Sequence, residues 1–315
     1  MRDGVLNVYK ERGYTSHDVV AKLRGILRMK KIGHTGTLDP EAEGVLPVCL
    51  GRATKLCDML TDETKTYRAT LLLGLETDTQ DVTGRETARY PVAVTEEEVR
   101  AAVLSFGGVY MQTPPMYSAR KKNGKKLYEL ARAGKEVERE ARPVTIHDIC
   151  VDEMTLPRVV LTVTCSKGTY IRTLCQDIGR KLGCGGCMES LTRLRVGRFL
   201  LEESVTLAQI EALRDSGALE QHIVPLDGMF ADLPKIVMRA GEGDRLVHNG
   251  NLFPPHLAVS ADASCRGRVR VYDSEEQFIG IYGFNDAERR YRPIKIFLGG
   301  NTGDADNHRN ETISD

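Results

Sequence analysis

Gly33-His34-Thr35-Gly36-Thr37-Leu38-Asp39-Pro40 places a carboxylate, an imidazole, two hydroxyls and two glycines within eight residues. Glycine adopts backbone angles that other residues avoid, so a loop of this kind can direct a side chain into a cleft. A structural interpretation competes with this one. Asp39, Pro40 and Glu41 also fit the N-cap, first position and first-turn acid of a helix. Taken alone, Asp39 is more typical of a helix cap than of a catalyst.

The residues after this loop form a denser pattern, which reads Asp39-Pro40-x-Ala42-x-Gly44-x-Leu46-Pro47-x-x-x-Gly51-x-Ala53-Thr54-Lys55. This run resembles the signature loop of the TruB family of tRNA pseudouridine synthases, whose loop aspartate is the essential catalytic residue. The resemblance therefore implies that Asp39 is catalytic. It also supplies further motifs with which the rest of the chain can be compared.

The composition is that of a globular protein. A chain of 315 residues, 41% hydrophobic and 28% charged, is long enough for two domains. No apolar run approaches the roughly 20 residues that span a membrane, and no signal-peptide pattern opens the chain, so we expect a cytoplasmic location. With 44 basic and 44 acidic residues, the chain does not hold nucleic acid by bulk charge, which leaves local basic surfaces as the candidates.

Eight cysteines in a chain of this character predict free thiols rather than disulfides. Cys184 and Cys187 have the spacing of half a zinc site, but the other cysteines lie singly and the histidines are scattered. We therefore expect no metal. The isomerisation that the resemblance implies needs no cofactor either.

The N-terminal residues predict a strand through Val8 and then a turn from Lys10 to Ser16, with Ser16 capping a helix. The turn resembles the first family motif, in which proline stands where this chain has Glu11. This departure puts the rigidity of the turn in question, but not the catalytic loop.

Residues 64–74 predict a strand that contains Tyr67. A strand tyrosine is usually half-buried with its hydroxyl at the surface. Lys65-x-Tyr67 also resembles the second family motif, whose tyrosine packs on the target base. Since a phenol with a pKa of about 10 is a weak base, stacking is favoured over proton removal. The following loop, residues 74–84, resembles a family loop, and its acidic residues are also typical of a solvated turn.

Residues 117–143 hold nine Lys or Arg against four Glu. Such runs are usually solvated surface, but cations on one surface also bind RNA by releasing its counterions. The pattern from Pro114 to Gly134 resembles the insertion with which the TruB family grasps the tRNA T-loop. The RNA-binding residues that this implies are Arg120, Lys121, Lys122, Lys125, Lys126, Arg132 and Arg142.

Residues 158–166 alternate between apolar and polar side chains, which predicts a strand, and a helix to Lys181 follows. Between them, residues 165–173 resemble the third family motif. In that motif the counterpart of Tyr170 packs beside the active site and the counterpart of Arg172 pairs with the catalytic aspartate. Arg172 could instead be a surface charge. A helix start disfavours a cation, however, and this favours a carboxylate partner.

Three more residues complete the implied site. Leu191 matches an apolar residue near the target base, and Thr37 is assigned to RNA binding. Flipping the base out costs on the order of a few kcal/mol, and stacking on Tyr67 returns about 1–3 kcal/mol. In the family, the counterpart of His34 fills the vacated space, although a turn histidine bonded to nearby backbone is the alternative.

The resemblance implies an α+β pseudouridine synthase fold, a mixed and largely antiparallel sheet with flanking helices, followed by a small β-barrel like a PUA domain. The expected catalytic domain is 1–232, with the RNA-gripping insertion at about 112–143. The PUA-like RNA-binding domain is expected at 233–300, and a disordered tail at 301–315.

The implied activity is isomerisation of uridine 55 in the tRNA T-loop, by a monomer that uses no guide RNA and no membrane. Whether Asp39 attacks the base, attacks the sugar or removes a sugar proton stays open. Two alternatives belong to other classes. One is a tRNA-binding or tRNA-folding protein on the same scaffold without catalysis, and the other is an unrelated small-molecule enzyme in which Asp39 caps a helix.

Overall fold

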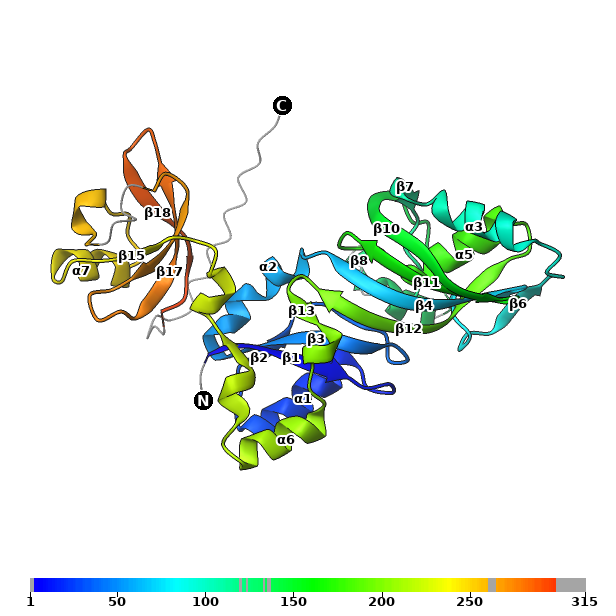
Figure 1. The fold of residues 1–315 in the computed structure, drawn as a ribbon, viewed down its shortest axis with the longest axis horizontal. Helices are drawn as coiled ribbons and strands as arrows, with labels where there is room; N and C mark the ends of the chain where they lie inside the picture. The colour runs from blue at the N-terminus through cyan, green and yellow to red at the C-terminus, as the bar shows by residue number, and fades with distance from the viewer. Residues whose placement is uncertain are drawn as a thin grey trace. The chain divides into compact units, whose positions relative to one another are not determined.

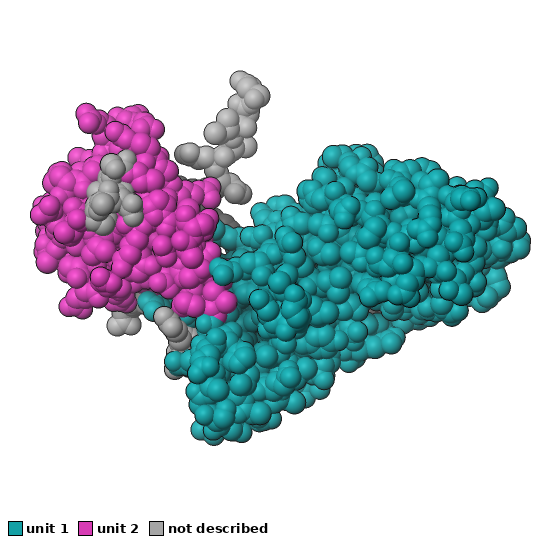
Figure 2. Space-filling view, in the orientation of Figure 1, with its two compact units in different colours: residues 1–223 teal, residues 224–315 magenta. Residues whose placement is uncertain are grey.

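The structure is a computed structural model that describes residues 3–118, 121–122, 124–132, 134, 137–259 and 265–298. The chain divides into two compact units, residues 1–223 and 224–315 (Figure 2). The sequence places the domain boundary slightly later, at 232–233. Within the described ranges, no helix is both long enough and apolar enough to cross a membrane.

The first unit is built on a mixed sheet of ten described strands (Figure 1). Along the sheet the order is β1-β3-β12-β4-β11-β10-β7, with β2 and β13 beside β3 and β12, and with β14 beyond β1. The β3–β12 pair is parallel, and the pairs β1–β3, β12–β4, β4–β11, β11–β10 and β10–β7 are antiparallel. The strands are β1 (Gly4–Lys10), β2 (Ile32–His34), β3 (Glu43–Leu50), β4 (Lys65–Leu73), β7 (Gly108–Gln112), β10 (Arg142–Thr155), β11 (Arg158–Cys165), β12 (Gly186–Val196), β13 (Phe199–Leu200) and β14 (Ile223–Pro225).

Two short hairpins and several helices surround this sheet (Figure 1). The hairpins are β5 (Leu75–Thr77) with β6 (Glu86–Arg89), and β8 (Lys121–Lys122) with β9 (Lys125–Lys126). The α-helices are α1 (Ser16–Leu27), α2 (Cys57–Thr61), α3 (Glu96–Leu104), α4 (Leu127–Arg132), α5 (Ile171–Lys181) and α6 (Leu207–Asp215). The 3₁₀ helices are η1 (Gly51–Leu56), η2 (Leu201–Glu203) and η3 (Leu219–His222). The expected mixed α+β architecture is confirmed.

Local sequence signals account for many of these elements. The alternating side chains Val159, Leu161 and Val163 of β11 are fully buried, as the period-two pattern predicts. Helix α3 begins with a capping box. The Thr95 backbone N–H donates to Glu98 Oε2 at 2.7 Å, and the Glu98 N–H donates to Thr95 Oγ1 at 3.2 Å. The same device opens α6, where Thr206 and Gln209 form the capping box.

The sheet carries two separate cores. One packs α3 and α5 against β4, β10, β11 and β12, and the other packs α1 and α6 against β1, β2 and β3. The loop that contains Asp39 runs between them. Ile32 before the loop belongs to the second core, whereas Leu38 and Ala42 belong to the first. This loop therefore crosses the line where the two halves of the sheet meet, at the parallel β3–β12 pair.

Two local predictions in this region are wrong. Asp39 does not begin a helix. The Ala42 N–H donates to the Asp39 carbonyl at 3.1 Å in a single turn, and β3 begins at Glu43. Pairing of β3 with β1 and β12 overrides the local capping signal. Ser16 is not the cap of α1 either, because Thr15 fills that position in a capping box with Asp18.

Gly44 lies where β3 meets β12, with a φ of +106°. A Cβ at this position would overlap the Arg193 backbone. We expect Gly44→Ala to lower the free energy of unfolding by at least about 2 kcal/mol, since a left-handed conformation and overpacking each cost about 1–3 kcal/mol. Urea denaturation measures this loss. Gly217→Ala is the control, with a φ of +77° and open space around its Cβ; an equal loss in both variants would contradict the steric argument.

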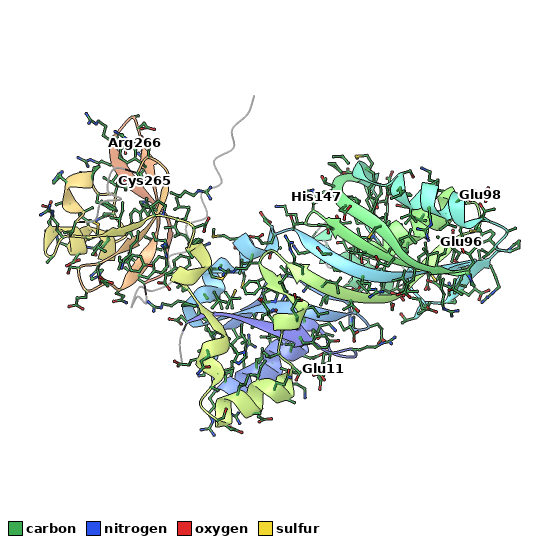
Figure 3. The ribbon with its side chains drawn as sticks, in the orientation of Figure 1. Glu11, Glu96, Glu98, His147, Cys265 and Arg266 are labelled. Carbon is green, nitrogen blue, oxygen red and sulfur yellow. The ribbon has the colours of Figure 1, made fainter. Side chains whose placement is uncertain are left out.

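The second unit contains a four-stranded sheet in the order β15 (Lys235–Val237), β16 (Arg268–Tyr272), β17 (Phe278–Asn285) and β18 (Arg290–Ile296). It also contains η4 (Asp227–Phe230), α7 (Glu242–His248) and η5 (Pro255–Leu257). Phe253 stacks on Tyr291 in its core, and Tyr291 donates to the Cys265 carbonyl at 2.6 Å (Figure 3). A small C-terminal β-domain is thus present, whereas the PUA assignment stays a prediction. The predicted disordered tail, 301–315, lies outside the described residues.

Candidate active site

Asp39 lies in a loop that is held on both sides by the segment joining β1 to α1. On one side, the Leu38 N–H donates to Ser16 Oγ at 2.9 Å. On the other side, the Pro40 carbonyl accepts from the Gly13 N–H at 2.9 Å and from Lys10 Nζ at 3.1 Å. The backbone on each side of Asp39 is therefore fixed by the segment that resembles the first family motif.

Lys10 closes the turn in which Glu11 replaces the proline of the family (Figure 3). Its ammonium group donates to the carbonyls of Glu11 at 3.1 Å and Tyr14 at 2.6 Å. Burial lowers the pKa of Lys10 to about 8, and the carboxylate of Asp39 opposes that shift. A buried cation thus organises the turn from within and links it to the Asp39 loop.

Arg172, in the first turn of α5, pairs with Asp39. Its Nε lies 2.9 Å from Asp39 Oδ2, and its Nη2 lies 3.4 Å from Asp39 Oδ1. The Arg172 side chain is 6% exposed and that of Asp39 is 39% exposed. The two-point contact orients the carboxylate from the protein side and leaves it accessible from the other side.

Three further groups hold Arg172, and the sequence identifies none of them as site residues. The carbonyls of Thr79 and Tyr117 accept from its guanidinium at 2.9 and 2.8 Å. Asp81 Oδ2 lies 3.8 Å from Nη1. Asp81 is not solvated, because its side chain is only 17% exposed, but it does form a turn by accepting from the Thr83 N–H. The acidic residues of the loop that ends at Gly84 could have pointed to Asp81 as a partner of Arg172. The two backbone carbonyls could not have been found in this way, because every residue has a carbonyl.

Tyr67 lies on β4, directly opposite Arg193 of β12, and is nearly buried. It shares a core with Leu38 and Leu191. This burial contradicts the alternative of a half-buried strand tyrosine. The cause is the position of β4 between β12 and β11 in the middle of the sheet. Burial raises the pKa of Tyr67, which leaves even less tyrosinate available as a base at neutral pH.

His34 ends β2 and is half-buried, while Thr37 is exposed. The Gly36 N–H donates to His34 Nδ1 at 3.3 Å, as expected of a turn histidine. The His34 ring also meets the ring of His17 on α1 edge to face, with centroids 5.3 Å apart. This arrangement satisfies the structural interpretation of His34 and leaves the RNA-contact interpretation untested.

His34 predicts a pH dependence of stability. Burial, with smaller contributions from His17 and Arg193, lowers the pKa of His34 to about 4, against about 6.5 in an unfolded chain. The unfolded state therefore binds the proton more readily, and the stabilisation present above pH about 6.5 is lost as the pH falls toward 4. We expect the melting temperature of His34→Asn to fall less over this range than that of the wild type. His147→Asn, at an exposed site on β10 (Figure 3), should follow the wild type; parallel curves for all three proteins would disprove the effect.

The other predicted site residues are Tyr170, Arg142 and the basic residues of the insertion. Tyr170 is the N-cap of α5, and its N–H and carbonyl are bound by the buried side chain of Gln112 at 2.8 and 3.0 Å. Arg142 is exposed at the start of β10. Arg120 lies outside the described residues, and the side chains of Lys121, Lys122, Lys125, Lys126 and Arg132 do so as well.

The site combines one accessible carboxylate with several buried cations. Lys65, whose pKa burial lowers to about 8, donates to the carbonyls of Thr61 and Glu63 at 2.9 and 2.6 Å. Arg193 donates to the Gly36 carbonyl at 3.3 Å, and Lys10 donates to the Pro40 carbonyl at 3.1 Å. In the described ranges, no group of three or more His, Cys, Asp or Glu could hold a metal ion. An ionised, oriented Asp39 in such surroundings can serve as a nucleophile, as a base or as a stabiliser of developing positive charge.

This fold and site define the class of pseudouridine synthases. The chain is similar to a chain in the structure of an H/ACA RNP bound to a substrate RNA containing 2′-deoxyuridine, with 25% identity and a TM-score of 0.68. The match covers 94% of this chain and 85% of that chain. A chain in a Cbf5-Nop10-Gar1 complex matches over the same shares, with 26% identity and a TM-score of 0.67.

Within that class, sequence comparison identifies the family. Residues 24–171 match the N-terminal domain of TruB family pseudouridylate synthase, and residues 172–231 match the tRNA pseudouridylate synthase B C-terminal domain. The tRNA pseudouridine synthase B of Lachnoclostridium phytofermentans is 51% identical over 94% of this chain and 100% of that protein. The protein of the same name from Alkaliphilus oremlandii is 44% identical over 93% and 97%. The chain belongs to the TruB family, whose members are isomerases.

Proposed function

We propose that this protein converts uridine 55 in the T-loop of tRNA to pseudouridine. The C1′–N1 bond breaks and a C1′–C5 bond forms, while the base loses a proton at C5 and gains one at N1. The atoms balance without any redox change, so no cofactor is required. The observation that carries the proposal is Asp39, accessible to substrate and oriented by Arg172, in a chain of the TruB family.

Six of the predicted residues take roles around the target base. Asp39 acts next to the C1′–N1 bond, and Arg172 orients it. Tyr67 and Leu191 form the apolar wall for the flipped base, and the cost of flipping is offset by stacking together with the grip on the loop. His34, with Thr37 beside it, occupies the space that the base leaves.

The basic insertion supplies the grip on tRNA phosphates. Its residues 121–122 and 125–126 form the β8–β9 hairpin, and α4 follows. This insertion supports action on tRNA without a guide RNA. We propose that the protein acts in the cytoplasm as a monomer. The names of the bacterial relatives, tRNA pseudouridine synthase B, support the same substrate. The catalytic domain is assigned to 1–232, and a PUA-like domain at 233–300 adds RNA contacts.

Release of tritium from an unmodified tRNA labelled at uridine C5 tests the proposal. We expect release of one equivalent from the wild-type transcript and none above background from a transcript with cytidine at position 55. Release that persists with cytidine 55 would assign another target uridine. Tight binding of tRNA without any release would favour the non-catalytic tRNA-folding function. Absence of both would overturn an RNA function altogether.

A further inference from the structure

Arg193 is a buried cation to which the proposed reaction assigns no role. It lies on β12, where that strand pairs in parallel with β3 and in antiparallel with β4. Its Cα partners are Gly44 on β3 and Tyr67 on β4. The residue is 1% exposed and is among the largest fully buried side chains of the described chain. Arg193 therefore lies between the strand that follows the Asp39 loop and the strand that carries Tyr67.

The guanidinium of Arg193 binds groups from both sides of this line. Its Nε donates to the Val45 carbonyl at 2.7 Å, and its Nη2 donates to the Gly36 carbonyl at 3.3 Å. Arg193 is also the cross-strand partner of Tyr67, and its charge acts on the Tyr67 hydroxyl. Gly36 precedes Asp39 by three residues, so one side chain connects the catalytic loop to the tyrosine of the base pocket.

These contacts include no carboxylate. Among the described residues, Arg193 forms no ion pair with Asp or Glu, unlike Arg172. Burial of a guanidinium without a counter-ion is costly, and a well-packed apolar side chain would ordinarily be more stable. Since the buried charge of Arg193 lowers stability, its presence beside the Asp39 loop favours a functional role for this residue.

Gly44 shows how the chain accommodates Arg193. With its positive φ and no Cβ, Gly44 allows the Arg193 backbone to approach β3 closely. The charge of Arg193 also affects the pKa values of the groups around it. It opposes the rise that burial imposes on the pKa of Tyr67, and it helps to lower the pKa values of Lys10, Lys65 and His34. One buried side chain thus influences both the geometry and the charge of the site.

We propose that Arg193 is a positioning residue for the isomerisation, which fixes the Tyr67 hydroxyl and the Gly36 carbonyl and so sets the base wall against the Asp39 loop. This inference rests on the proposed function. Arg193 acts through Tyr67 and the loop, and it does not touch the substrate. Loss of its guanidinium should therefore lower kcat far more than it alters KM.

A double-variant experiment with Tyr67→Phe separates this role from simple structural support, because the effects of the two substitutions on kcat should not be additive. We expect Arg193→Gln to lower kcat about tenfold, with KM within about twofold, and Arg193→Lys to be intermediate. In the Tyr67→Phe background, Arg193→Gln should change kcat by less than about twofold, because the hydroxyl it holds is already absent. Arg195→Gln, at an exposed position two residues further along β12, is the matched control and should behave as the wild type. Multiplicative losses in the double variant would overturn the proposal.

A second measurement does not depend on turnover. In the full-length chain, 3-fluorotyrosine at position 67 reports its surroundings by ¹⁹F NMR. We expect its resonance to move and its pKa to rise in Arg193→Gln, and to stay unchanged in Arg195→Gln. An unchanged resonance in Arg193→Gln would refute the contact whether or not the protein proves active. If Arg193→Gln does not fold, the kinetic comparison and the ¹⁹F NMR measurement are both made on Arg193→Lys instead. Failure of the wild type to release tritium would refute the proposed function, and the NMR result would then decide the Arg193 contact alone.

Discussion

Asp39→Asn should release tritium from C5-labelled tRNA at less than about a thousandth of the wild-type rate, while binding tRNA within about twofold of the wild type. The amide has the shape of the carboxylate but is neither a nucleophile nor a base at neutral pH. Arg172 keeps its hydrogen bonds to the Thr79 and Tyr117 carbonyls, so its position does not depend on Asp39 alone. The loop itself is held through Leu38 and Pro40, whose contacts are unchanged.

A matched control is available in the same unit. Asp62 lies just after α2 and forms an exposed ion pair with Lys167 at 2.8 Å. Asp62→Asn removes the same charge away from the site and should retain full activity. Filter binding and tritium release on one tRNA preparation separate affinity from chemistry. If Asp39→Asn kept a tenth of the wild-type rate, Asp39 would not be the catalytic group. If it lost tRNA affinity in proportion to rate, its role would be binding.

The sequence predicts those parts of the structure that local patterns or dense motifs encode. Period-two alternation identifies β11, and Thr-x-x-Glu and Thr-x-x-Gln spacings identify the starts of α3 and α6. Both signals act over a few residues, so no tertiary information is needed to use them. The Asp39 loop is singled out by the dense pattern of residues 39–55 that resembles the TruB signature, since Asp39 alone fits a helix cap equally well.

The sequence does not reveal contacts that join distant segments. Arg172 binds the Thr79 carbonyl across 93 residues and the Tyr117 carbonyl across 55. Any residue offers a carbonyl, so no residue type marks these positions. Local signals can also mislead: Asp39-Pro40-Glu41 fits a helix start, but the long-range pairing of β3 with β1 and β12 prevails. Arg193 shows the same limit, since only the strand register places it beside Tyr67.

Arg172→Lys should lower kcat by about 10²-fold, and Arg172→Met by more, because the guanidinium orients Asp39 through a geometry that an ammonium cannot reproduce. The four short contacts of Arg172 reach two carboxylate oxygens and two carbonyls at 2.8–3.4 Å. A lysine presents a single charged nitrogen and cannot span them. Steady-state tritium release gives kcat and KM for each variant. We expect KM to change little, since Arg172 is nearly buried and faces the protein.

The same substitutions should reduce stability, which urea denaturation measures. Arg172→Met leaves the Thr79 and Tyr117 carbonyls without their donor, and an unsatisfied buried polar group costs about 1–3 kcal/mol. The loss from the Asp39 pair is smaller, because that carboxylate is 39% exposed and water can replace the guanidinium. Arg180→Met, further along α5, removes an Arg–Glu76 ion pair in which the arginine is 57% exposed, and should cost less than about 1 kcal/mol. Equal effects of the two substitutions on kcat and stability would mean that the buried network around Arg172 does not orient Asp39.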